Sequence, residues 1–169
     1  DKKLLDPLPE NILQAAKSYF LPKELDLLQQ AFNIASSAHQ DQFRQEGTPY
    51  ITHPVAVTLI LLDLHLDVET VCSGMMHDVL EDSLFKKPYI EKLFGKDTAA
   101  IIDGVSNLNK LDFDNIEDRN ANNLQKMALA MSKDIRVIIV KLCDRLHNMQ
   151  TIEFLPREKQ IRKSIETLE

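Results

Sequence analysis

His77-Asp78-Val79-Leu80-Glu81-Asp82 gathers one imidazole and three carboxylates within two turns of a predicted helix. Helical spacing puts His77 and Glu81 on one face and Asp78 and Asp82 on the next, about 100° away. Like charges at this density are costly to pack unless a cation lies among them. Taken alone, the segment is as consistent with a solvated acidic face beside a surface histidine as with a metal site. Its apolar surroundings favour burial, where charges need partners or a metal ion; they are Met75, Met76, Val79 and Leu80.

Hydrophobic residues recur at helical spacing along nearly the whole 169-residue chain. The pattern predicts helices over about 12–21, 23–42, 54–64, 67–81, 89–94, 97–107, 120–132, 134–151 and from 156 onward. Gly47 and Pro49 mark a loop within 44–50, Gly95 closes a short helix, and 111–119 is expected to be a mobile loop. The sequence therefore predicts an all-α protein with a single domain over residues 1–169.

The composition excludes one broad class of partner. A formal net charge of −6 argues against a nucleic-acid-binding domain, because duplex affinity depends on Lys and Arg that neutralise phosphates. The longest apolar run, residues 55–62, is too short to cross a bilayer. Cys72 and Cys143 lie far apart in apolar helical contexts, so we expect reduced core residues in a cytoplasmic protein. A nucleotide can still bind an acidic protein where a metal ion and local cations make the pocket positive.

Two stripes run along the clearest predicted helix, residues 134–151. We expect the apolar stripe to pack in the core; it consists of Ile135, Ile138, Ile139, Leu142, Leu146 and Met149. We expect the polar stripe beside it to border a cavity; it consists of Lys141, Asp144, Asn148 and Thr151. Asp144 is the acidic member of the polar stripe, although a surface salt bridge with Lys141 or Arg145 would equally account for it.

His53 precedes Pro54 at the start of a predicted helix, where the X-Pro bond restricts its backbone. A histidine in that position is more often a capping or surface residue than a ligand. Together with the acidic residues it nevertheless completes a set of nitrogen and oxygen donors without a thiolate: His53, His77, Asp78 and Asp144. This set suits an ion such as Mn²⁺ or Fe²⁺ with water in the open positions. A metal site that keeps water is catalytic rather than structural.

The order of these motifs resembles a known family. The spacing H…HD…D is the signature of the HD phosphohydrolase superfamily, and residues 39–148 are similar to the hydrolase domain of long RelA/SpoT homologues. The matching motifs are His39-Gln-Asp-Gln-Phe-Arg44, Gly47-Thr-Pro-Tyr-Ile-Thr-His-Pro-Val-Ala56, His77-Asp-Val-Leu-Glu-Asp82, Leu93-Phe-Gly95, Gly104-Val-Ser106 with Leu108 and Lys110-Leu111, and Lys141-Leu-Cys-Asp-Arg-Leu-His-Asn-Met149. They follow one another in order over most of the chain.

The resemblance implies an HD-domain bundle of about ten helices that binds one Mn²⁺. The implied reaction is that of a guanosine-3′,5′-bis(diphosphate) 3′-pyrophosphohydrolase, which removes the 3′-pyrophosphate of ppGpp or pppGpp in the stringent response. The products are GDP or GTP and pyrophosphate. The resemblance assigns metal ligation to His53, His77, Asp78 and Asp144, orientation or activation of the attacking water to Glu81 and Asp82, the guanine contact to Arg44 and a polar substrate contact to Asn148.

The resemblance also implies a covalently linked synthetase domain C-terminal to Glu169, in a bifunctional protein rather than a stand-alone small hydrolase. It implies no membrane and no nucleic-acid partner for this domain. The chain departs from the family at Asn107, Gln125 and Gln150, where basic residues are usual. Each replacement removes a cation, so substrate affinity or interdomain control is expected to differ.

The remaining histidines receive supporting roles. We expect His39 to pack near the site, and His65 and His147 to be structural.

Two alternatives stand beside the hydrolase interpretation: an HD phosphohydrolase for another nucleotide, and a catalytically inactive regulatory module. The loop that carries Arg44 argues against the first alternative. The intact ligand set and the Glu81–Asp82 pair argue against the second.

Overall fold

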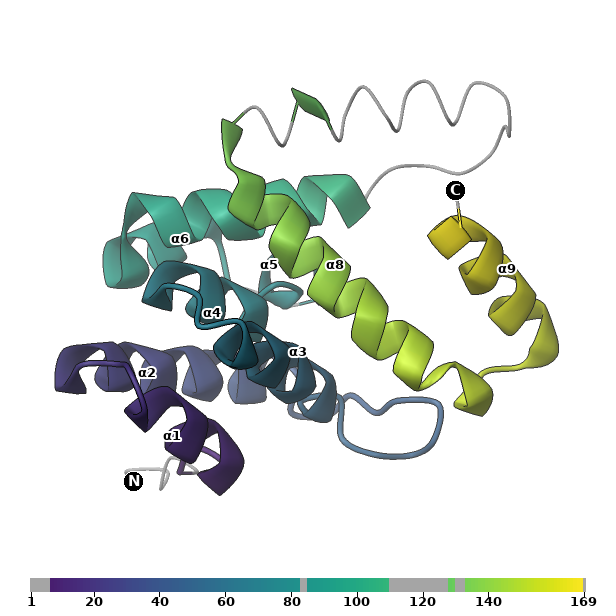
Figure 1. Ribbon diagram of the computed structural model, residues 1–169, viewed down its shortest axis with the longest axis horizontal. Coiled ribbons are helices and arrows are strands. Elements are labelled where there is room, and N and C mark those ends of the chain that lie inside the picture. Colours follow the sequence, from purple (N-terminus) through teal and green to yellow (C-terminus); the bar gives the residue numbers. More distant parts are fainter. Residues whose placement is uncertain (1–6, 83–84, 110–127, 130–132, 169) are drawn as a thin grey trace.

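A computed structural model describes residues 7–82, 85–109, 128–129 and 133–168. In these ranges the chain forms eight α-helices and one 3-10 helix, with an isolated bridge between Phe43 and Pro49 (Figure 1). The helices are α1 (Glu10–Lys17), α2 (Pro22–Ala38), α3 (Thr52–Asp63), α4 (Val68–Met75), α5 (Val79–Asp82), α6 (Lys87–Asn109), α8 (Ile135–Gln150), η1 (Ile152–Phe154) and α9 (Arg157–Leu168).

The all-α prediction is confirmed for this part of the chain. The loop expected over 111–119, most of the helix expected over 120–132, and Gln125 lie outside the described residues. Among the helices that the structure describes, none combines the length and the apolar character needed to cross a membrane.

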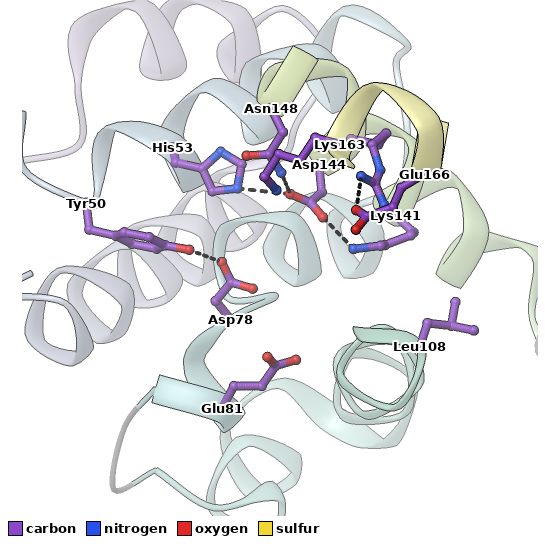
Figure 2. A pocket seen from close by; sticks show the side chains of 11 residues that line it. Tyr50, His53, Asp78, Glu81, Leu108, Lys141, Asp144, Asn148, Lys163 and Glu166 are labelled. Carbon is purple, nitrogen blue, oxygen red and sulfur yellow. Dashed lines mark hydrogen bonds and ion pairs between the residues drawn. The ribbon is translucent and has the colours of Figure 1, made fainter. Parts of the chain in front are cut away.

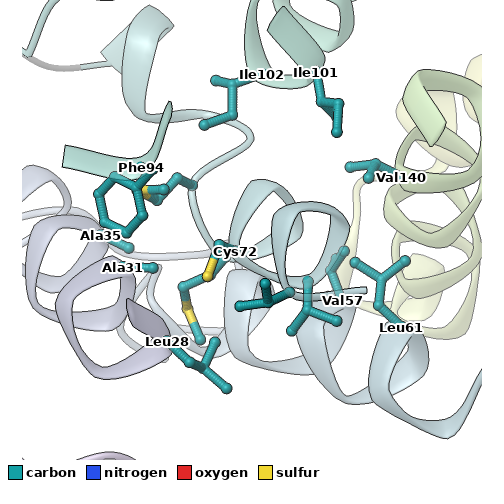
Figure 3. Packing of buried hydrophobic residues seen from close by; sticks show 14 of the residues in the cluster. Leu28, Ala31, Ala35, Val57, Leu61, Cys72, Phe94, Ile101, Ile102 and Val140 are labelled. Carbon is teal, nitrogen blue, oxygen red and sulfur yellow. The ribbon is translucent and has the colours of Figure 1, made fainter. Parts of the chain in front are cut away.

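Helix α4 lies at the centre of the core and packs against α2, α3 and α6. Every residue of α4 except Glu69 is buried, as expected for a helix surrounded by other elements. Helix α3 contacts α1, α4 and α8, and α8 also packs on α6. Figure 3 shows how side chains from α2, α3, α4, α6 and α8 meet around Cys72 and Leu61. Cys72 and Cys143 are both reduced and buried, as predicted.

Gly74 allows α3 and α4 to approach each other closely. A Cβ atom at Gly74 would lie 2.2 Å from Cδ1 of Leu61 on α3, well inside van der Waals contact. Leu61 is fully buried and therefore has little room to move away. Where α3 begins and α4 has just ended, the rings of His53 and His77 also lie close together, with centroids 5.2 Å apart.

The predicted continuous helix over 67–81 is wrong. Helix α4 ends at Met75, Met76 leaves the helical region with φ −113° and ψ 13°, and α5 begins only at Val79. No glycine or proline at 76–78 signals this break. The Gly74 carbonyl, which would accept the Asp78 amide in a continuous helix, accepts a hydrogen bond from the His77 ring, and such side-chain bonds compete with the helical ladder.

The predicted core face of α8 is confirmed only in part. Ile138 is buried and Ile139 packs against the core, but Ile135, Leu142 and Leu146 are exposed, and Leu142 is 60% exposed. The buried face consists of Val137, Ile138, Val140, Cys143 and Asp144. Helix α8 therefore turns its acidic residue inward and leaves part of its leucine stripe on the surface.

The segment that joins α2 to α3 forms the predicted loop. Helix α2 ends at Ala38, four residues before the expected end, with His39 as its C-cap. The loop closes through hydrogen bonds between Arg44 and Thr48 and between Arg44 and Gly47, and Gly47 takes a positive φ of 84°. Gly95 takes a φ of 87° within α6, so the predicted division between a short helix and a following one is confirmed.

Candidate metal centre

Three separate elements meet at one buried cluster of donors. The first turn of α3 supplies His53, the turn between α4 and α5 supplies His77 and Asp78, and the middle of α8 supplies Asp144. All four residues are buried. The ligand atoms of His53, His77 and Asp144 all lie within 4.8 Å of one another, a spacing that allows a single metal ion to contact all three.

Distances within the cluster define how the donors face one another. Nε2 of His53 lies 3.1 Å from Oδ1 of Asp144 (Figure 2). Nε2 of His77 lies 3.8 Å from the same oxygen. Nε2 of His77 also lies 3.1 Å from Oδ2 of Asp78. Asp78 therefore borders the three-residue group through His77 without being part of it, and ligation by Asp78 stays a prediction.

The hydrogen bonds of His77 fit a metal ligand. Its Nδ1 lies 2.7 Å from the Gly74 carbonyl, which can only accept, so Nδ1 carries a proton and donates. Its Nε2 is buried and has no hydrogen-bond partner among the described residues. Once Nε2 gives up its proton, His77 presents a lone pair to a space bordered by two carboxylates, which is the arrangement that a divalent cation requires.

Charge coupling within the cluster is strong. Burial by itself would lower the pKa of His77, but the carboxylates of Asp78 and Asp144 outweigh burial and raise the pKa to about 9. Burial opposes ionisation of the two carboxyls, yet nearby positive groups and hydrogen bonds hold the pKa of each well below its usual range. Lys141 contributes through an ion pair of 2.8 Å with Oδ2 of Asp144. The cluster thus stabilises positive charge where a metal ion would lie.

Several neighbours hold the donors in place. The Tyr50 hydroxyl donates to Oδ2 of Asp78 at 2.6 Å, and the Asn148 amide donates to Oδ1 of Asp144 at 2.7 Å. The buried ring of His39 packs against Tyr50 with centroids 4.7 Å apart, as its predicted packing role requires. Sequence reasoning missed Tyr50, although it stands within the motif that contains His53.

The sequence predicts structural roles for two other histidines. His65 is exposed and stacks on Tyr19, away from the cluster, in agreement with that expectation. His147 instead contacts His53 directly, with 2.7 Å between the two Nδ1 atoms. Its position three residues after Asp144 on α8 was the available sequence signal, because residues at that spacing share a helix face.

A pocket of about 300 Å³ opens beside the cluster (Figure 2). Its lining includes the carboxylates of Asp78, Glu81, Asp144 and Glu166, and α8 and α9 also contribute cations. The cationic residues are Lys141, Arg145 and Lys163. Glu81 lies in this lining, and its role in activating water stays a prediction. The side chain of Asp82 lies outside the described part of the structure.

The two predicted substrate residues occupy different positions. Asn148 lines the pocket but directs its amide to Asp144. Arg44 is not part of the pocket lining; its guanidinium donates to Glu46 at 2.9 Å and to the Thr151 hydroxyl at 2.7 Å. Thr151 lies one turn beyond His147 on the same side of α8, so the Arg44 side chain borders the cluster from the loop side. Asn107 and Gln150, two of the three departures from the family pattern, are exposed.

The described part of the chain is all-helical and carries a buried His–His–Asp group beside a polar pocket. These features place it among helical proteins with a candidate metal centre. A family model described as "HD domain" matches residues 31–169, and the chain belongs to this family. Its relatives identify the branch as the HD domain of RelA/SpoT proteins.

Two curated relatives illustrate this. The chain is 44% identical to the "Bifunctional (p)ppGpp synthase/hydrolase SpoT" of Escherichia coli K12 over 160 residues, which cover 95% of this chain and 23% of that protein. It is 48% identical over 136 residues to a guanosine-3′,5′-bis(diphosphate) 3′-pyrophosphohydrolase of Haemophilus influenzae, covering 80% of this chain and 20% of that one. The chain thus spans about a fifth to a quarter of these relatives.

A solved structure is also similar, and it is described by the words "A metazoan ortholog of SpoT hydrolyzes ppGpp and plays a role in starvation responses". It matches with a TM-score of 0.64 and 25% identity, over 85% of this chain and 80% of that one. The shared fold therefore extends over most of both chains.

Proposed function

We propose that this chain is a metal-dependent (p)ppGpp 3′-pyrophosphohydrolase that uses Mn²⁺. The observation that carries the proposal is the convergence of His53, His77 and Asp144 beside a pocket that is lined by both carboxylates and cations. Relatives at 44–48% identity carry the names of (p)ppGpp hydrolases, which supplies the substrate class. His53, His77 and Asp144 would hold the ion, with Asp78 as the fourth protein ligand.

When bound, Mn²⁺ would supply a Lewis acid that polarises a phosphoryl oxygen and lowers the pKa of its bound water. The chain's own residues complete the reaction. The carboxylate of Glu81, on the pocket wall one turn beyond Asp78, can take a proton from the attacking water. Asp82 is assigned the same task of orienting or activating that water.

The cations that line the pocket suit the charged substrate. A pyrophosphate group carries several negative charges, and the pocket lining includes the cations Lys141, Arg145 and Lys163. Lys141 pairs with Asp144, and Arg145 pairs with Glu166. Preorganised cations of this kind stabilise the charge that develops on a departing pyrophosphate. Arg44, held by Glu46 and Thr151, would present its planar guanidinium to the guanine, since a planar cation can stack on a base and Lys cannot.

The proposal extends to the protein from which the domain comes. The E. coli relative is named as both synthase and hydrolase, and the aligned region makes up 23% of it. We therefore propose that a synthetase domain is covalently linked on the C-terminal side of this domain. We also propose that the protein is cytoplasmic.

Incubation of the purified chain with ppGpp and Mn²⁺, followed by anion-exchange separation of the products, tests the function. The expected products are GDP and pyrophosphate in equal amounts, with no turnover after chelation and recovery on addition of Mn²⁺. GTP and ATP in place of ppGpp serve as controls for an HD hydrolase of another nucleotide. Intact ppGpp after incubation with Mn²⁺-loaded protein would refute the proposal.

A further inference from the structure

His53 and His147 form a hydrogen-bonded pair at the edge of the metal cluster. Their Nδ1 atoms lie 2.7 Å apart, and their rings are 4.9 Å apart between centroids at an angle of 33°. The other nitrogen of His53, Nε2, faces Asp144 at 3.1 Å. His53 thus has one nitrogen directed into the cluster and the other directed to His147.

A hydrogen bond between two ring nitrogens requires a proton on one of them and a lone pair on the other. Without an ion, His53 can donate from Nε2 to Asp144 and accept at Nδ1. An ion coordinated by Nε2 removes that arrangement, because the nitrogen must then offer its lone pair. The proton of a neutral His53 moves to Nδ1, and the partner that the structure gives to Nδ1 is the ring of His147.

We infer that His147 is a positioning residue for the metal centre: its Nδ1 accepts the Nδ1 proton of His53 and keeps the bare Nε2 of His53 aimed at the ion. His77 has the same relation to the Gly74 carbonyl, which accepts from its Nδ1 at 2.7 Å. Ligating histidines commonly depend on such an acceptor for the choice of tautomer and for ring orientation. For His53 the acceptor is the side chain of His147, so the acceptor can be removed by substitution.

The backbone around His147 supports this role. His147 lies three residues after Asp144 on α8, so one helix face carries both the ligand and the acceptor. The Thr151 hydroxyl donates to the His147 carbonyl at 3.0 Å and accepts from Arg44 at 2.7 Å. The C-terminal end of α8 therefore links the Arg44 side chain to the backbone of His147 through Thr151.

The inference rests on the proposed metal site, and two substitutions test it. His147→Leu removes the acceptor. His147→Asn keeps an amide oxygen that can accept in place of Nδ1. His65→Asn, at an exposed histidine with a positive φ that Asn tolerates, is the matched control. Circular dichroism verifies that each variant is folded.

The measurements are Mn²⁺ affinity, from the electron paramagnetic resonance of free Mn²⁺, and ¹⁵N NMR of the imidazoles in protein loaded with diamagnetic Zn²⁺. The chain has five histidines, so the imidazole spectrum can be assigned by substitution. We expect Zn²⁺-loaded wild type to show a protonated Nδ1 and a coordinated Nε2 on His53. His147→Leu should weaken Mn²⁺ binding about 10–100-fold, the usual effect of losing such a support, and His147→Asn should restore most of the affinity.

The outcomes separate the inference from the function on which it rests. If Zn²⁺ coordinates His53 but His147→Leu binds Mn²⁺ as tightly as wild type, or His53 coordinates through Nδ1, the role of His147 is refuted and the metal site stands. If Zn²⁺ leaves the His53 signals unchanged, the metal site and the inference both fail.

Discussion

Replacement of Glu81 by Gln separates activation of water from binding of the metal. Glu81 lies on the pocket wall, but it is not a member of the three-residue group of potential ligands. Its side chain is exposed, so solvent screens its charge and loss of that charge should change Mn²⁺ affinity little. Gln keeps the shape of the side chain and cannot accept a proton at neutral pH.

The expected loss in kcat follows from that role. A positioned general base contributes roughly 10²–10⁴ in rate, or about 2.7–5.4 kcal/mol of activation free energy at 1.36 kcal/mol per factor of ten. If Glu81 only balanced charge, the effect on kcat would be less than about tenfold, because an exposed charge contributes on the order of 1 kcal/mol. The two explanations therefore differ by at least one order of magnitude in rate.

Single-turnover ppGpp hydrolysis, Mn²⁺ stoichiometry and ppGpp affinity are measured on the same Glu81→Gln preparation. Glu158→Gln, on the exposed face of α9, is the matched control and should behave as wild type. Wild-type turnover in Glu81→Gln would refute the role in activating water. Loss of the metal would instead identify Glu81 as a ligand.

Three further substitutions test the other parts of the site. Asp144→Asn removes the anionic donor nearest to both histidines and should weaken Mn²⁺ binding at least about tenfold, measured by titration; unchanged affinity would remove Asp144 from the ligand set. Arg44→Ala should raise KM for ppGpp with the metal still bound, measured by steady-state kinetics and metal analysis, and an unchanged KM would place the base elsewhere. Gly74→Ala puts a Cβ 2.2 Å from Leu61 Cδ1 and should cost about 1–3 kcal/mol of unfolding free energy, measured by urea denaturation. In combination with Leu61→Ala the two losses should sum to less than their separate values, and independent, additive effects of the two changes would contradict the proposed contact.

Sequence reasoning predicted the helical class, the loop before α3 and the division of the chain at Gly95, because periodicity and glycine punctuation are local properties. It was only partly right about which residues of α8 face the core. That helix carries two stripes at helical spacing, one with Leu142 and Leu146 and one with Val140 and Asp144, and periodicity alone cannot tell which faces the core. Tertiary contacts with α3 and α6 determine the answer.

The break at Met76–Asp78 could not be predicted for a related reason. Its cause is a side-chain bond from His77 to the Gly74 carbonyl, and no residue with a special backbone preference marks it. In a continuous helix His77 and Asp78 would diverge by about 100°, whereas the turn places an oxygen of Asp78 3.1 Å from Nε2 of His77. The contact between His53 and His147 likewise joins residues 94 positions apart and carries no local signal.

The location of the metal tests the central claim most directly. Crystals of the Mn²⁺-loaded chain, measured on both sides of the manganese absorption edge, give an anomalous difference map that identifies both the element and its position. We expect one peak bounded by Nε2 of His53, Nε2 of His77 and a carboxylate oxygen of Asp144, with Asp78 completing the protein ligands. A map without a peak at these residues, from crystals saturated with Mn²⁺, would contradict it.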